Sequence, residues 1–168
     1  MASTTHFRSR WKENQYDSVR VWIAPDADVP LSREDNRYVV RDAFHEWSDA
    51  GAPVRFVFVA DSAQADVQVV WRDSLPDARA GQVTRFTDKR GWLRSATIEL
   101  STRSMSGKSQ KTSTVHAVAL HEVGHLLGLE HSDDDHDIMA AWVTSSGLSA
   151  RDVALMRALY GVVQDFQD

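Results

Sequence analysis

Hydrophobic residues along this chain recur with two different periods, which predicts a domain that mixes strands and helices. Residues 19–23 alternate apolar and polar side chains, the two-residue period of a strand with one buried face. Two Val- and Phe-rich segments, 54–59 and 66–71, are also typical of strands. Residues 81–86 and 96–100 complete the predicted strands, and a glycine-containing turn lies between them.

The first and last predicted helices carry capping residues at their N-termini. The first is expected to begin at Ser32, with Asp35 three positions later as its capping partner, and to end before Gly51. The last is expected to begin at Ser149, with Asp152 in the equivalent position. The predicted order along the chain is therefore strand, helix, several strands, helix, loop and helix.

The middle helix carries the residues with the clearest chemistry. It is predicted to be capped by Thr112 or Ser113 and to stop at Gly128. His121 and His125 lie four positions apart within it, so both imidazoles project from one helix face toward a shared metal ion. These two histidines would supply two of the three protein ligands of a catalytic zinc site.

A third histidine completes the site only if the helix breaks. His131 lies ten residues after His121, which in a continuous helix is about 15 Å along the axis, whereas ligands of one zinc lie within about 4 Å of each other. Gly128 is placed to turn the chain back, because a residue without Cβ adopts the left-handed conformation. Three neutral imidazoles leave a position open for water, and Glu122 is placed to act as its general base.

Composition excludes several other classes of function. The chain has 168 residues, which predicts one domain over residues 1–168 with residues 1–17 as a flexible N-terminal segment. Lys plus Arg number 19 against 24 Asp plus Glu, a net charge of -5 that argues against a nucleic-acid partner. There is no cysteine, so disulfides, thiol catalysis and cysteine-ligated zinc are excluded. Neither a membrane span nor a signal peptide is visible.

The metal-binding motif also carries a family resemblance. Residues 121–131, followed by Ser132 and Met139, resemble the metzincin zinc endopeptidases, most closely the matrixin (matrix-metalloproteinase-like) branch. The likeness extends to residues 35–58, 65–69 and 148–161. This resemblance implies an α/β (α+β) sandwich, in which a twisted mixed sheet and three helices border a horizontal active-site cleft.

The resemblance assigns a role to each residue of the motif. It implies that His121, His125 and His131 bind one catalytic Zn²⁺ and that Glu122 is the catalytic base. Met139 would be the Met-turn residue beneath the metal. The implied function is a secreted, zinc-dependent endopeptidase that hydrolyses internal peptide bonds of extended polypeptides, and we expect a monomer.

We expect the substrate to bind along residues 81–86, as the edge strand of the sheet. An extended peptide adds to such an edge through main-chain hydrogen bonds, so recognition tolerates many sequences. The candidate substrate-binding residues are Gly81, Val83, Thr84, Val118 and Trp142.

The chain departs from the matrixin pattern in three ways. It lacks the Pro-Arg-Cys-Gly latency segment, because it has no cysteine. No histidine lies between Arg72 and Ile98, so the family's second, structural zinc site lacks its ligands and one zinc per chain is expected. Residues 140–143 replace the usual Pro-x-Tyr after the Met-turn, which predicts a different shape for the main specificity pocket.

Other polar residues admit two interpretations. Four aspartates crowd residues 133–137, and a solvated acidic turn is favoured over a Ca²⁺ site. His116 lies five positions before His121, so we expect it to face away from the ligands in a polar surface role. Trp142 fits either the core or a pocket wall.

Two other function classes remain open from sequence alone. A metzincin-like domain could bind peptides without cleaving them, although retention of Glu122 beside the three histidines disfavours this. A zinc-assisted hydrolase of non-peptide amides is disfavoured by the predicted edge strand. A peptide-cleavage assay with and without chelator discriminates among these classes.

Overall fold

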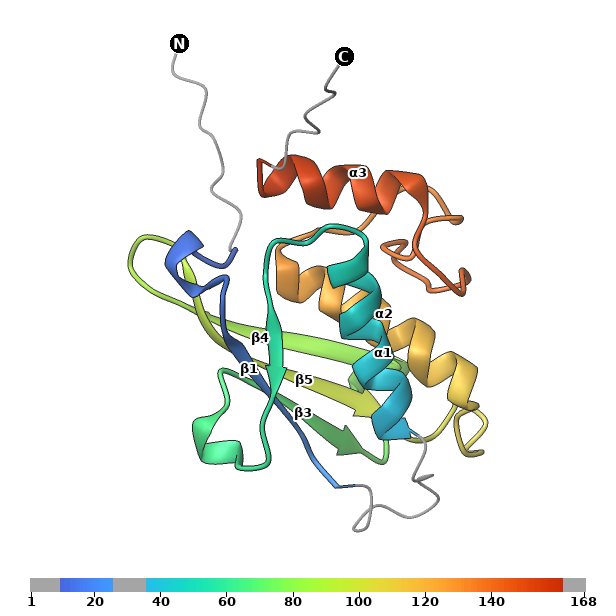
Figure 1. Cartoon of the computed structure of the whole chain (residues 1–168). Coiled ribbons are helices and arrows are strands. Elements are labelled where there is room, and N and C mark those ends of the chain that lie inside the picture. Colours follow the sequence, from blue (N-terminus) through green and yellow to red (C-terminus); the bar gives the residue numbers. More distant parts are fainter. Residues whose placement is uncertain (1–9, 26–35, 162–168) are drawn as a thin grey trace.

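A computed structural model describes residues 10–25 and 36–161 of the chain (Figure 1). The predicted start of the first helix, at Ser32 and Asp35, lies outside the described residues. The elements are β1 (Val19–Ile23), α1 (Asn36–Asp49), β2 (Phe56–Phe58), β3 (Val67–Arg72), β4 (Gly81–Thr87), β5 (Leu93–Ser101), α2 (Thr112–Leu127) and α3 (Ala150–Leu159). Short 3-10 helices also occur at Glu13–Gln15, Ser62–Gln64 and Pro76–Ala78.

The strands form a mixed sheet, five-stranded within the described residues, in the order β2-β1-β3-β5-β4. All neighbouring pairs are parallel except β4 and β5, which form an antiparallel hairpin. The consecutive strands β4 and β5 need only a short turn, in which Gly91 adopts a φ of 83°. Among the described strands, β4 pairs only with β5, so it is a sheet edge as the sequence predicted.

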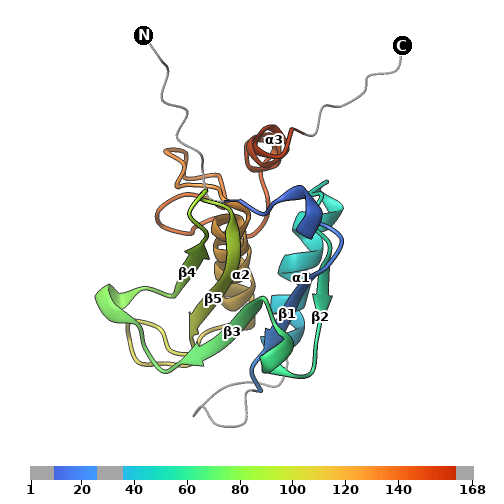
Figure 2. The same ribbon diagram turned by 90° about the vertical axis from the view of Figure 1, so that its left-hand side faces the viewer.

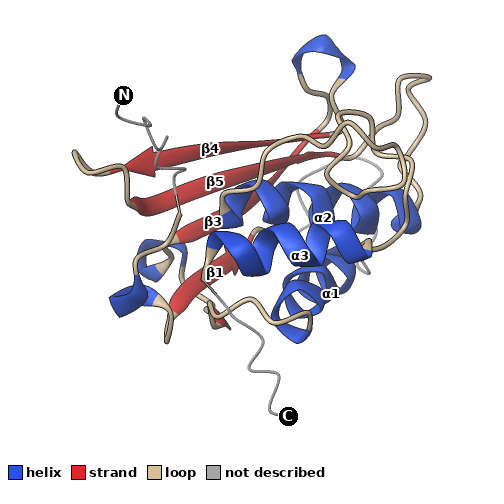
Figure 3. Cartoon of the chain, turned by 90° about the horizontal axis from the view of Figure 1, so that it is seen from above, coloured by secondary structure: helices blue, strands red, loops and turns tan. Residues whose placement is uncertain are grey.

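The helices α1 and α2 cover the same face of this sheet (Figures 2 and 3). Their contact is fixed by Trp47 of α1, which is fully buried and donates its indole N–H to the carbonyl oxygen of Leu120 in α2 at 2.9 Å. The core lies between the helices and the inward-facing residues of the sheet, including Val21, Val69 and Ile98. Burial of these side chains supplies the main favourable free energy of folding.

The helix α3 lies apart from the sheet, near the C-terminal end of α2 (Figure 1). Its predicted capping box is confirmed, since the Ser149 hydroxyl accepts from the Asp152 N–H and the Asp152 carboxylate accepts from the Ser149 N–H, both at 2.9 Å. At its other end, the Tyr160 hydroxyl donates to the carbonyl oxygen of Leu127 at 2.7 Å. This second contact connects α3 to the last turn of α2.

Several predicted boundaries were wrong. The N-cap of α2 is Lys111, not Thr112 or Ser113, because the Lys111 carbonyl already accepts from the N–H groups of Thr114 and Val115. The strand predicted over residues 54–59 is regular only over Phe56–Phe58, whereas β5 extends beyond the predicted 96–100 in both directions. The fold class itself, an α/β arrangement of three helices and a mixed sheet within the described residues, is confirmed.

We expect Asp152→Ala to destabilise the protein strongly. The Asp152 side chain is fully buried, and its carboxylate also accepts hydrogen bonds from the N–H groups of Ile138 and Met139 at 2.8 and 3.3 Å. Removing it leaves buried donors unsatisfied, so the free energy of unfolding should fall by about 2 to 4 kcal/mol in urea titration. Asp61→Ala, which removes an exposed capping carboxylate, is the control and should cost less than about 1 kcal/mol. Equal effects of the two substitutions would contradict this role.

Candidate metal centre and active site

Two of the three histidines of the motif lie on adjacent turns of α2. His121 is 5% exposed and His125 is half-buried, in a helix that is buried along most of its length. Their ring centroids are 4.6 Å apart and their Nε2 atoms approach to 3.0 Å. The four-residue spacing therefore brings the two rings together as predicted.

The third histidine reaches the same point because the chain reverses at Gly128. This residue ends α2 in the left-handed conformation, with φ 105° and ψ 7°. The N–H of the next residue, Leu129, donates to the carbonyl oxygen of Gly124 at 2.9 Å, which closes the turn. The His131 ring then lies with its centroid 5.2 Å from that of His121 and 4.8 Å from that of His125. The predicted break at Gly128 is confirmed.

Backbone carbonyls set the tautomer of both helical imidazoles. Nδ1 of His121 lies 2.7 Å from the carbonyl oxygen of Ile138, and Nδ1 of His125 lies 2.8 Å from that of Leu129. A carbonyl oxygen only accepts, so Nδ1 carries the proton in both rings and the Nε2 lone pairs face the centre. Burial, reinforced by the neighbouring His121, lowers the pKa of His125 to about 4, and burial also lowers the pKa of His121.

The resulting set of donors fits a zinc ion. One nitrogen from each of His121, His125 and His131 lies within 4.8 Å of the others. Neutral imidazole nitrogens are preferred zinc ligands, and second-shell carbonyls orient metal-binding histidines in this manner. Within residues 10–25 and 36–161, these histidines form the one cluster of three or more metal-ligating side chains.

Glu122 lies beside the histidine cluster in an apolar environment. Its side chain is 5% exposed, and burial raises its pKa to about 8 although the positive charge of Arg79 opposes the shift. The start of β4 approaches this carboxylate closely, since a Cβ on Gly81 would lie 2.8 Å from Oε1 of Glu122 and 2.7 Å from Cγ1 of Val118. The absence of a side chain at position 81 therefore makes room for Glu122.

A cleft of about 990 Å³ opens over the three histidines and Glu122. Of the predicted substrate-binding residues, Gly81, Val83, Val118 and Trp142 line it. Trp142 is 76% exposed and belongs to the cleft wall, not to the core. Thr84 does not line the cleft, whereas its β4 neighbours Gln82, Val83 and Arg85 do.

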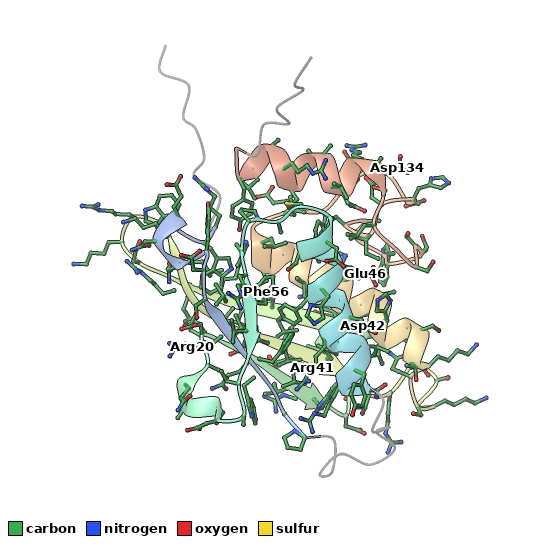
Figure 4. All side chains as sticks on the ribbon, viewed as in Figure 1. Arg20, Arg41, Asp42, Glu46, Phe56 and Asp134 are labelled. Atoms are coloured by element: carbon green, nitrogen blue, oxygen red, sulfur yellow. The ribbon has the colours of Figure 1, made fainter. Side chains whose placement is uncertain are left out.

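The remaining polar residues of the motif region have structural partners. The ring of His116 contacts the carboxylate of Glu46, at 2.5 Å from Nε2 to Oε1. Glu46 lies on α1 (Figure 4). The acidic segment is not uniformly solvated, because Asp137 is buried and accepts hydrogen bonds from the hydroxyls of Ser132 and Ser149 at 2.5 and 2.6 Å. Asp134 remains at the surface beside α3 (Figure 4) and binds the N–H of His136.

Sequence reasoning missed several residues that shape the cleft. Arg79 and Arg85 also line it, and the alternation of residues 81, 83 and 85 along β4 was the signal that could have found Arg85. Sequence reasoning also missed a side-chain contact between neighbouring strands. The Glu99 carboxylate accepts from Arg72 Nε at 2.5 Å and from Gln82 Nε2 at 2.8 Å. These bonds connect β3, β5 and β4 in a region without histidine.

Comparison with known proteins resolves the family. The sequence model of the matrixin family matches residues 10–161, which is most of the chain. This chain belongs to the matrixin family. The matrixin is 33% identical to metalloendoproteinase 1-MMP of Arabidopsis thaliana, over 95% of this chain and 47% of that protein. It is 32% identical to interstitial collagenase of Sus scrofa, over 90% of this chain and 33% of that protein.

Macrophage metalloelastase of Oryctolagus cuniculus is a further relative, 28% identical over 82% of this matrixin and 31% of the elastase. The chain thus spans about a third to a half of the length of the curated relatives it matches. The predicted class, zinc metalloendopeptidase, is confirmed at the level of the family. Within the described residues of the matrixin, no helix is both long and apolar enough to cross a membrane.

We expect Gly128→Val to weaken zinc binding more than it weakens the fold. A β-branched residue is strained at this φ, so the turn that returns His131 should shift and zinc affinity should fall by about tenfold or more in chelator competition. Gly91→Val is the matched control, because Gly91 also has positive φ but lies in the β4–β5 turn. Unchanged zinc affinity in a folded Gly128→Val variant would show that His131 does not depend on this turn.

Proposed function

We propose that this matrixin is a zinc-dependent endopeptidase that hydrolyses internal peptide bonds of extended polypeptides. The observation that carries the proposal is the convergence of three imidazoles beside a buried glutamate, in a cleft lined by β4, which is an edge strand among the described residues. In peptide hydrolysis the imidazoles would bind the metal, the glutamate would act as the base and the strand edge would bind the substrate main chain. The ligands, the base and the strand edge together favour a peptide substrate over a small amide.

We assign the Nε2 atoms of His121 and His125, and one ring nitrogen of His131, as ligands of a single zinc. When bound, zinc supplies a Lewis acid that polarises the scissile carbonyl and makes water a stronger acid near neutral pH. The chain's part is to hold three neutral donors in place, and the carbonyls of Ile138 and Leu129 do this for the two helical rings.

We assign Glu122 as the general base. Its carboxylate follows the first ligand on α2, lines the cleft and is shielded from bulk water. In this role it accepts a proton from the attacking water and then delivers it to the leaving amine, so the residue ends the cycle in its starting state. Gly81 holds the strand close to it without filling the space that the carboxylate needs.

We assign Met139 the Met-turn role, as a packing residue below the histidines. Its side chain is buried and lies against Gly124, where a Cβ would overlap its sulfur. Its carbonyl oxygen accepts from the N–H of Ser132 at 2.8 Å, directly after the third histidine. Met139 therefore contacts α2 through its side chain and the segment after His131 through its main chain.

We propose that the substrate adds to β4 as a further strand. The main chain of an edge strand offers hydrogen bonds to any extended peptide, and the side chains of Val83, Val118 and Trp142 bound the cleft beside it. Thr84 would contribute through its main chain. We further infer a monomer that acts on protein or peptide substrates outside the cell, on the basis of its family.

Glu122→Ala should retain one zinc per chain and lose activity. All three ligands remain, so metal analysis of the dialysed variant should match the wild type, while the turnover of a casein or gelatin substrate falls by about 10²- to 10⁴-fold. Glu130→Ala removes an exposed carboxylate from the same motif and should leave both readouts unchanged. Near-normal turnover of Glu122→Ala would refute the assigned base, and two zinc ions per chain would refute the single site.

Gly81→Ala should reduce activity without loss of zinc. The added methyl would lie within 3 Å of Glu122 and Val118, so the base must move while the histidines keep their places. We expect kcat/KM to fall by about tenfold or more. Gly147→Ala is the control, since a Cβ there has no neighbour within 4 Å. A Gly81→Ala enzyme with wild-type kcat/KM would show that Glu122 is not confined by β4.

A further inference from the structure

The cleft differs in charge from the protein that surrounds it. The chain as a whole carries a net charge of -5, yet three arginines line the cleft: Arg79, Arg85 and Arg103. The carboxylates of its lining are Asp77 and the buried Glu122. The exposed cleft wall is thus locally basic on an acidic protein.

The three arginines are not equivalent. Arg103 Nε contacts Asp73 Oδ1 at 2.5 Å, and its Nη1 donates to the carbonyl oxygen of Gly107 at 3.3 Å, so its charge is already compensated. Arg79 and Arg85 form no ion pair with a carboxylate among the described residues. Two guanidinium groups at the cleft are therefore open to an external carboxylate, which binds arginine in a planar, two-bond geometry.

Arg79 and Arg85 line the cleft from different positions along the chain. Arg79 lies two residues before β4 and lines the cleft. Arg85 shares the cleft face of β4 with Gly81 and Val83, and its Nη1 donates to the carbonyl oxygen of His125 at 3.2 Å. That bond holds the guanidinium over the C-terminal end of α2 and leaves its other donors free for a ligand.

We propose that Arg79 and Arg85 select peptides with an acidic side chain on each side of the scissile bond. This inference rests on the proposed endopeptidase function and specifies its substrate class. The two arginines are six residues apart, so they span at most about 20 Å of extended chain. A peptide lying along β4 would cover this span with about six residues, and we place its scissile bond near the centre of the span.

Arg79 and Arg85 should differ in how strongly each selects an acidic side chain. Asp77 lines the cleft two residues before Arg79 and offsets part of the positive potential there. No carboxylate lies beside Arg85 among the lining residues, and its hydrogen bond to His125 pre-orders the side chain. The acidic side chain at the Arg85 end therefore contributes more to selection than the one at the Arg79 end.

Matched fluorogenic peptides test this proposal directly. Peptides with one common core would carry Glu, Gln or Lys at about two to four residues on each side of the cleaved bond. The expected order of kcat/KM is Glu, then Gln, then Lys, with about a tenfold difference between the extremes that shrinks at high salt. Equal kcat/KM for the three series in the wild-type protein would overturn the proposal.

Arginine variants identify the residues responsible. Arg85→Gln should lower the Glu-to-Lys ratio of kcat/KM by about three- to fivefold, and Arg79→Gln by less. Because the readout is a ratio within one variant, a general loss of turnover or of zinc cancels. Arg90→Gln is the matched control, since Arg90 is exposed in the β4–β5 turn and does not line the cleft. An acidic preference that survives in the Arg79→Gln/Arg85→Gln double variant would overturn the assignment.

A binding measurement separates this proposal from the proposed function. The same peptides, labelled at one end, would be titrated with the zinc-loaded wild-type protein and followed by fluorescence anisotropy. If no peptide is cleaved but acidic peptides bind about tenfold more tightly than basic ones, the endopeptidase proposal fails and the cleft assignment stands. If peptides are cleaved but neither Kd nor kcat/KM depends on their charge, the endopeptidase proposal stands and this inference fails.

Discussion

The geometry of a helix prevents α2 from delivering all three histidines to one point, so the centre depends on the reversal of the chain at Gly128. A residue ten positions beyond His121 would lie about 15 Å away on a continuous helix. The left-handed conformation at Gly128 instead brings the His131 ring to within 4.8 Å of that of His125, centroid to centroid. The same turn places the Leu129 carbonyl on Nδ1 of His125, so one reversal positions one ligand and orients another.

The segment that follows this reversal has little regular structure, and α3 supplies the bonds that hold it. Asp152 binds the N–H groups of Ile138 and Met139, and the Ile138 carbonyl in turn faces His121. Tyr160 binds the carbonyl of Leu127 at the end of α2. The last helix is therefore remote from the sheet, yet two hydrogen bonds connect it to the His121 ring through Ile138.

The sequence predicted the parts of this arrangement that arise from local spacing. The face shared by His121 and His125, the turn at Gly128 and the capping box at Ser149 each depend on a few consecutive residues, and each is confirmed. Long-range contacts were not predictable. The burial of Asp137 between two serines, the Glu99 contacts across three strands and the clearance between Gly81 and Glu122 all join residues that are distant in sequence or set by packing.

The open edge of the sheet also has a consequence for self-association. A strand that accepts a peptide can equally accept β4 of a second molecule, which is the usual route to edge-to-edge aggregation. In an antiparallel pairing centred on Gln82, however, Arg79 of each molecule would oppose Arg85 of the other. Like charges directly opposite each other destabilise a strand pair, so the two arginines would disfavour this pairing of two copies, whereas an acidic peptide would not meet this repulsion. The two arginines would therefore act against this mode of edge-to-edge association.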